Sequence, residues 1–149
     1  MTVLHTSAER LIDAPADTVY RYIADFQQHH PRWLPSAFSE FSVEEGGYGA
    51  GTINTFRMTL GGRSQEFRTR FAEPVPGRVL TETDEKKQIR TSFTVTPEGP
   101  ICRVRIDTEW EPSGGIQGRI ERLMAPRMLR GLYRAELEKL KDYARSQGG

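Results

Sequence analysis

Apolar and polar side chains alternate along most of the chain between Phe38 and Pro112, and this period of two is the spacing of β-strands. The alternation is clearest at residues 65–71 and 102–110, where every second residue is charged. Gly61-Gly62 separates two such runs and is a strong signal for a two-residue hairpin turn. These observations predict about five or six antiparallel strands joined as hairpins, each with an apolar face opposite a charged one.

Helical spacing precedes this region. A short strand is expected over Thr6–Asp13, and the following Pro15 and Asp17 suit the first turn of a helix. Apolar side chains three and four residues apart continue to Phe26 and predict a helix of about three turns. The two prolines within Gln27–Pro35 indicate a loop or a broken second helix.

Helical spacing returns after the alternating region. Residues 113–146 carry apolar side chains three and four apart and predict one long C-terminal helix. Pro126 lies inside this stretch, so we expect a kink near Met124 or Ala125. A sheet with one apolar face must cover that face, and only this helix is large enough to do so.

Composition restricts the classes of function. The chain has 149 residues, with 21 Lys and Arg against 20 Asp and Glu, so a strongly basic nucleic-acid-binding protein is excluded. Its one cysteine cannot form an intramolecular disulfide, and no Cys/His spacing suits zinc. We expect no metal, no cofactor, no membrane span and no signal peptide. The expectation is a single domain over residues 1–149, cytoplasmic, and a monomer or weak homodimer.

Four segments resemble the helix-grip superfamily, also called SRPBCC or START-like: Ile12–Tyr20, Ile23–Asp25, Pro31–Pro35 and Glu136–Ala144. This superfamily includes START domains, plant pathogenesis-related allergens, and the bacterial polyketide cyclase/dehydrase and lipid-transport-like group. The resemblance implies an α+β fold in which a curved antiparallel sheet of about six to seven strands surrounds the long C-terminal helix. It also implies two short helices after the first strand and an apolar cavity between the sheet and the long helix.

The faces predicted to point inward supply the candidate ligand-binding residues. Such residues either fill a solid core or line a ligand pocket, and threonines among them serve either as strand formers or as ligand partners. Arg127 follows Pro126 and either binds a ligand carboxylate or lies on the surface among other arginines. The candidates are Phe56, Met58, Phe67, Thr69, Phe93, Ile106, Thr108, Trp110, Leu123, Met124 and Arg127.

No catalytic residue is assigned from the sequence. His29 and His30 are adjacent in a polar loop and are expected to be solvated, although histidine is a common general acid or base. Cys102 is expected to be a small apolar filler. The carboxylates of the strands are expected on the outer face, where they cannot form an acid–base pair in a pocket: Glu66, Glu82, Asp107 and Glu109.

Three functional hypotheses remain. The first is binding of a small hydrophobic molecule (lipid, aromatic polyketide or isoprenoid-like) between the sheet and the C-terminal helix, where apolar burial supplies most of the affinity. The second is a polyketide cyclase/dehydrase-type enzyme that uses the same cavity for aldol cyclisation or loss of water. The third is a protein-interaction or regulatory module that uses the outer sheet face, whose alternating charges favour solvation over binding.

Overall fold

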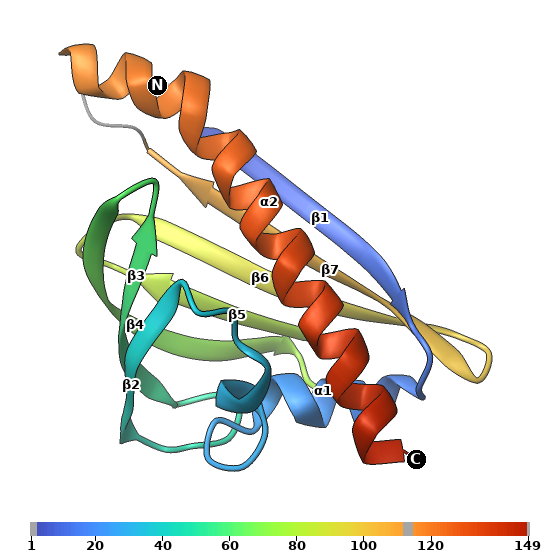
Figure 1. Ribbon diagram of the computed structural model, residues 1–149. Helices are drawn as coiled ribbons and strands as arrows, with labels where there is room; N and C mark the ends of the chain where they lie inside the picture. Colours follow the sequence, from blue (N-terminus) through green and yellow to red (C-terminus); the bar gives the residue numbers. More distant parts are fainter. Residues whose placement is uncertain (1–2, 112–114, 149) are drawn as a thin grey trace.

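The computed structural model describes residues 3–111 and 115–148, without the side chains of residues 115–124. Within these residues, one seven-stranded antiparallel sheet curves around a long C-terminal helix (Figure 1). The elements are β1 (Leu4–Ile12), α1 (Ala16–Ala24), the 3-10 helix η1 (His30–Trp33), β2 (Phe38–Glu45), β3 (Ile53–Leu60), β4 (Arg63–Val75), β5 (Val79–Asp84), β6 (Ile89–Glu98), β7 (Ile101–Trp110) and α2 (Gly115–Gly148). The predicted helix-grip fold is confirmed.

The strand order is β1-β7-β6-β5-β4-β3-β2, so all neighbours except β1 and β7 are consecutive hairpins. The β3–β4 turn shows how the sequence joins consecutive strands as a hairpin. Leu60 pairs with Arg63, and Gly61 and Gly62 between them have φ angles of 60° and 78°. Positive φ at both central residues is the geometry of a type I′ turn, which matches the natural twist of paired strands. The glycine pair therefore sets the register of the hairpin, as predicted.

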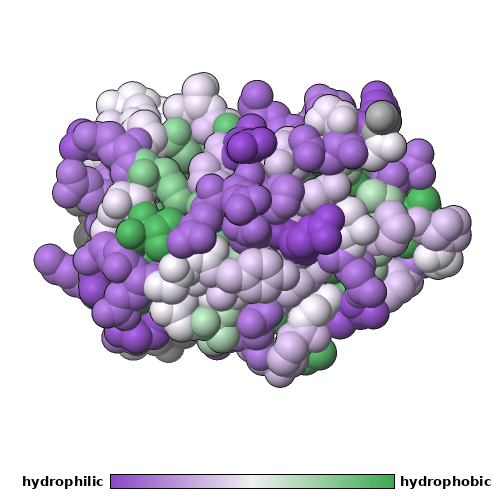
Figure 2. All heavy atoms as spheres, turned by 90° about the horizontal axis from the view of Figure 1, so that it is seen from below, coloured by the Kyte–Doolittle hydropathy of each residue, from purple (hydrophilic) through white to green (hydrophobic). Residues whose placement is uncertain are grey.

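The sheet separates apolar from charged side chains. In β4, Phe67, Thr69 and Phe71 are buried, whereas Glu66, Arg68 and Arg70 between them are exposed. The outward residues of neighbouring strands form ion pairs across the sheet surface. Seen from below, the molecular surface is mostly hydrophilic and carries only small, separate hydrophobic areas (Figure 2). Among the described residues, no helix has the length and apolar character to cross a membrane.

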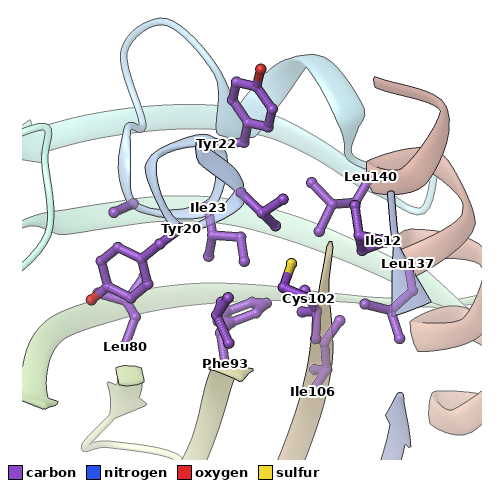
Figure 3. Packing of buried hydrophobic residues seen from close by; sticks show 14 of the residues in the cluster. Ile12, Tyr20, Tyr22, Ile23, Leu80, Phe93, Cys102, Ile106, Leu137 and Leu140 are labelled. Carbon is purple, nitrogen blue, oxygen red and sulfur yellow. The ribbon is translucent and has the colours of Figure 1, made fainter. Parts of the chain in front are cut away.

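The solid part of the core lies where both helices meet the sheet. Ile23 of α1, and Leu137 and Leu140 of α2, approach Cys102 and Ile106 of β7 (Figure 3). α1 packs against β6 and β7, whereas α2 packs mainly against β1 and η1. Because the helices concentrate on this half of the sheet, the inner faces of β3 and β4 are less tightly covered.

Pro126 lies inside the continuous helix α2, and the helix changes direction in its N-terminal part (Figure 1). Proline lacks the N–H that would complete the helical hydrogen bond at its position. The hydroxyl of Thr6 on β1 donates a hydrogen bond of 3.0 Å to the Pro126 carbonyl. This bond fastens the helix to the edge of the sheet near the proline.

Candidate functional site

A cavity of about 90 Å³ lies among the inner faces of β2–β7, η1 and α2. Two aromatic groups form its apolar walls. In the first, the rings of Phe26 and Phe71 are tilted relative to one another, with their centroids 4.4 Å apart. In the second, Phe56 and Phe67 are stacked at 5.2 Å, and Phe38 meets Phe56 edge-on at 5.7 Å. The space is smaller than the roughly 300–1,000 Å³ of pockets for drug-sized ligands, so a ligand must displace side chains at the rim.

The structure brings together six of the predicted ligand-binding residues on the cavity wall: Phe56, Met58, Phe67, Thr69, Phe93 and Thr108. Three others are elsewhere, which corrects their predicted position. Ile106 is fully buried in the solid core, Trp110 lies beside a separate surface depression, and the Arg127 side chain is exposed. Leu123 and Met124 lie outside the residues whose side chains are described.

Glu82 lines the cavity, and its predicted outward position is wrong. In the observed register Glu82 lies opposite Phe71 on β4 and Thr91 on β6, both of which face inward. The short strand β5 therefore presents Leu80, Glu82 and Asp84 to the interior, whereas Val79 and two threonines are on the other face. An apolar pattern cannot identify a strand whose inner face carries two carboxylates, because alternation is read from hydrophobicity.

Glu136 on α2 is the second carboxylate that sequence reasoning missed, and its residue is only 2% exposed. No hydrogen bond or ion pair within the described residues uses the side chain of Glu82 or Glu136. Burial raises the pKa of Glu82 to about 7, and the nearby charge of Asp84 raises it further, partly offset by the adjacent Thr69 hydroxyl. Burial also raises the pKa of Glu136 to about 8, with a further contribution from Glu82.

Three hydroxyl groups form a hydrogen-bonded series that runs from the strand next to Glu82 to the helix that carries Glu136. Thr91, the partner of Glu82 across β5 and β6, shares a hydrogen bond of 2.7 Å with Thr108. Thr108 in turn lies 2.5 Å from the Tyr133 hydroxyl on α2. Tyr133 precedes Glu136 by three residues, which places both on one side of the helix. Burial raises the pKa of Tyr133 well above its ordinary value, so its hydroxyl stays protonated.

His30 also faces the cavity, and the expectation that it is solvated is wrong. Its residue is 5% exposed and lies against Phe26 and Trp33, with ring centroids 4.8 and 4.3 Å away. Nδ1 lies 2.6 Å from the Ile23 carbonyl, which can only accept, so Nδ1 carries the proton. Burial lowers the pKa of His30 to about 4, and the imidazole is therefore neutral near pH 7.

A family model described as polyketide cyclase / dehydrase and lipid transport matches residues 3–145. The chain belongs to this family. Its structure is similar to that of the KanY protein, with 31% sequence identity and a TM-score of 0.84, covering 96% of this chain and 98% of that chain. No curated protein matches the sequence. Membership of the polyketide cyclase / dehydrase and lipid transport family supports a role in binding a hydrophobic ligand or in cyclisation.

Two more distant structures share the fold. The ZhuI aromatase/cyclase from a Streptomyces species is 13% identical, with a TM-score of 0.80, and covers 99% of this chain and 97% of that one. Norcoclaurine synthase from Thalictrum flavum, in complex with dopamine and hydroxybenzaldehyde, is 18% identical, with a TM-score of 0.71. That match covers 97% of this chain and 88% of the synthase. At these identities the comparison establishes the fold alone.

This member of the cyclase/dehydrase family also has a larger surface depression, of about 1030 Å³, outside β3, β4 and the β5–β6 turn. Two arginines of its wall form ion pairs: Arg57 pairs with Glu66, also in the wall, at 2.8 Å, and Arg68 pairs with Glu44 at 2.9 Å. Phe67 is shared with the inner cavity. A ligand site needs apolar walls with a few unpaired polar groups, and this combination is found in the inner cavity. In the described part of the chain, no group of three His, Cys, Asp or Glu side chains is placed to hold a metal ion.

Proposed function

We propose that the protein binds a small aromatic or polyketide-like carbonyl compound in the cavity and catalyses an aldol-type cyclisation or dehydration on it. One observation carries this proposal: Glu136, which is buried, and Glu82, which is half-buried, are two carboxyl groups without an ionic partner in the described residues, and they line the same aromatic cavity. Desolvated carboxylates are unfavourable, so a protein that only carried an apolar ligand would gain nothing from them.

The different pKa values of Glu82 and Glu136 suggest which carboxyl group is the general acid and which is the general base. Repulsion between two carboxylates in a desolvated site favours a state in which only one is ionised. The pKa of Glu136, raised to about 8, keeps it protonated near neutral pH, whereas Glu82, with a pKa of about 7, is the more readily ionised. Glu82 is therefore the general base and Glu136 the general acid, because catalytic pKa values near the working pH are the most effective.

The chemistry follows from these roles. Glu82 removes a proton from the carbon next to a ligand carbonyl, while Glu136 donates a proton to the carbonyl oxygen, which yields an enol. The enol carbon attacks a second carbonyl carbon of the same molecule and forms a carbon–carbon bond. In this step the enol proton returns to Glu136, and Glu82 gives the proton that it removed to the new alkoxide, which becomes a hydroxyl group. Loss of that hydroxyl as water, with one further proton from the adjacent carbon, completes the condensation. The balance is one water released, with no oxidant or reductant.

Two structures that share the fold are consistent with this proposal. One structure with the same fold is an aromatase/cyclase, and another is a synthase in complex with hydroxybenzaldehyde, an aromatic carbonyl compound. Binding without chemistry is the alternative function, and the family description includes lipid transport. The buried carboxylates favour the enzyme.

The experiment uses a probe that reports enolisation without knowledge of the natural substrate. Acetophenone is incubated with the protein in D₂O, and exchange of its methyl protons is followed by NMR. We expect Glu82→Gln and Glu136→Gln each to slow the protein-dependent exchange by about 10²–10⁴-fold, which is the usual contribution of a general acid or base. Glu138→Gln is the matched control, because Glu138 is exposed on the same helix and pairs with Arg10 at 2.8 Å.

Two outcomes would contradict the proposal. One is exchange that the wild-type protein does not accelerate. The other is exchange that neither Gln substitution slows. Acetophenone binding without exchange would support a ligand carrier in place of an enzyme.

A further inference from the structure

Two neighbouring polar side chains in the cavity wall have no hydrogen-bond partner among the described residues. Asn54 on β3 is 1% exposed, and neither its Nδ2 nor its Oδ1 makes a hydrogen bond with any described residue. Thr69 on β4 is 4% exposed, and its Oγ1 has no partner at hydrogen-bond distance among the described residues, although its proximity to the Glu82 carboxylate partly offsets the increase that burial causes in the pKa of that group. The two residues are direct cross-strand partners. Folded proteins pair nearly all buried polar atoms, so three unpaired atoms at one position need an explanation.

Thr52, next to β3, is a buried polar side chain with a structural role, and it contrasts with Asn54. Thr52 is fully buried, and its hydroxyl accepts a hydrogen bond of 3.1 Å from the Gly47 backbone N–H. This bond holds the turn before β3. Asn54 lies two residues further along the same strand and does not hold any turn or cap any helix. Asn54 lines the cavity, so its amide is available to an occupant of that space.

The position of the pair suits an aromatic occupant. Phe71 and Phe67 lie on either side of Thr69 on the inner face of β4, and each belongs to a different aromatic wall of the cavity. Asn54 and Thr69 therefore lie between the two aromatic walls, within the same cavity lining. A polar substituent of a ring bound beside them can meet one amide donor, one amide acceptor and one hydroxyl. This remains true if the amide is rotated by half a turn.

We propose that Asn54 and Thr69 orient the ligand and select compounds that carry a carbonyl group next to a hydrogen-bond donor. Such a carbonyl accepts from the Asn54 amide and the Thr69 hydroxyl, while the neighbouring donor binds the Asn54 carbonyl. Sites built to bind polar groups discriminate strongly against analogues that lack them, because the protein groups are then left unpaired. The inference rests on the proposed function only in requiring a ligand in this cavity, and it does not depend on the catalysis.

Binding of three matched single-ring probes tests this selection. Benzamide carries a carbonyl and an N–H donor, acetophenone carries the carbonyl alone, and ethylbenzene carries neither. By calorimetry, we expect the wild-type protein to bind benzamide about tenfold more tightly than ethylbenzene, with acetophenone between them. Asn54→Leu should abolish the preference, and Thr69→Val, which leaves β3 unchanged, should reduce it severalfold. Equal affinities for the three probes, or no binding of benzamide by the wild type, would overturn the proposal.

Thermal unfolding of the same variants separates a ligand site from a structural role. If the Asn54 amide is unpaired in the free protein, Asn54→Leu replaces it by an apolar group of similar shape, and the Tm should rise. Thr52→Val removes a used hydrogen bond, and its Tm should fall. A Tm loss in Asn54→Leu as large as that in Thr52→Val would show that the amide is already satisfied, for example by ordered water, and would overturn the proposal.

The outcomes also separate this proposal from the proposed function. Retained preference for benzamide together with no acetophenone exchange would remove the catalytic role of Glu82 and Glu136 and leave the Asn54–Thr69 subsite intact. Exchange that depends on both glutamates, without discrimination among the probes, would leave the catalysis intact and remove the subsite.

Discussion

Glu136 links the stability of the protein to pH. Its folded-state pKa is about 8, against 4.5 for an ordinary glutamate, because burial penalises the charged form. As pH rises from 4.5 to 8, the unfolded chain gives up this proton and the folded chain keeps it. Stability associated with Glu136 is therefore present at low pH and is lost through this window.

Glu136→Gln cannot ionise, so we expect it to become more stable than the wild type as the pH increases. The two proteins should have similar free energies of unfolding at pH 4.5. At pH 8.5 the variant should be more stable by on the order of 2–4 kcal/mol, from about 1.4 kcal/mol per pKa unit. Urea unfolding at the two pH values measures the difference, with the exposed Glu138→Gln as control. A constant difference between variant and wild type at all pH values would refute this account.

His30 predicts the opposite dependence on the acid side. Burial lowers its pKa from 6.5 to about 4. Between these two pH values, His30 is therefore protonated in the unfolded chain and neutral in the folded chain. Stability associated with His30 is therefore lost as the pH falls from 6.5 towards 4. The NMR signals of the His30 ring should remain those of a neutral imidazole protonated on Nδ1 at pH 5. A midpoint near 6.5 would disprove the buried, neutral state.

At the scale of single residues, the sequence predicted apolar wall positions better than polar ones. Phe56 and Phe67 were identified because they lie on faces whose alternation is unambiguous. Glu82 and Glu136 were missed because a carboxylate inside a protein breaks the very pattern from which inside and outside are inferred. Residues that violate local rules are expected at functional sites, so the failures fall where the chemistry is proposed.

The β3–β4 hairpin and helix α2 touch through one small residue. A Cβ atom added to Gly61 would collide with the Cε of Met128 on α2, and the φ of 60° at Gly61 already disfavours any other residue. The glycine therefore serves both the turn and the close approach of the hairpin to the helix, beside the cavity wall formed by the same two strands.

Gly61→Ala should lower the free energy of unfolding by about 1–2 kcal/mol, from backbone strain and from the displaced methionine. Chemical denaturation measures this loss. Gly62→Ala is the matched control, because it has a similar φ of 78° and no atom within contact distance of an added Cβ. The part of the loss that exceeds the control should disappear in the Met128→Ala background. Equal losses at both glycines would show that the contact with α2 has no energetic role.

At the scale of elements, the strands and turns could be predicted because most strands have one solvent-exposed face and the turns contain residues that favour them. The glycine pair of β3–β4 and the helical spacing of the tail sufficed for those elements. The register of β5 did not follow from its own six residues, since it is set by pairing with β4 and β6. The Thr6 hydrogen bond to Pro126, which joins residues 120 positions apart, likewise has no local signal.

The ion pairs of the described residues lie on the outer surface of the molecule, so its stability should respond weakly to salt. The described ion pairs join exposed side chains, such as Arg90 with Glu109 at 2.6 Å and Arg103 with Glu98 at 2.8 Å. Pairs of this kind contribute about 0–1 kcal/mol each and are screened by salt. Raising NaCl from 0.05 to 0.5 M should change the free energy of unfolding by less than about 1 kcal/mol. A decrease of several kcal/mol in the free energy of unfolding would contradict this prediction and would mean that the surface ion pairs contribute much of the stability.

The pairing of β1 with β7 has a consequence for how the protein is made. Leu4 is opposite Trp110, and α2, the last element, packs on β1, the first. During synthesis, β1 has no strand partner until β7 has left the ribosome, and the cavity is not closed until α2 follows. Contacts between residues so far apart in the chain require loop closure, and its entropy is lost before the contacts contribute favourable free energy. This slows folding. The cavity is thus completed only at the end of synthesis, when α2 brings Leu129, Tyr133 and Glu136 against strands that were made earlier.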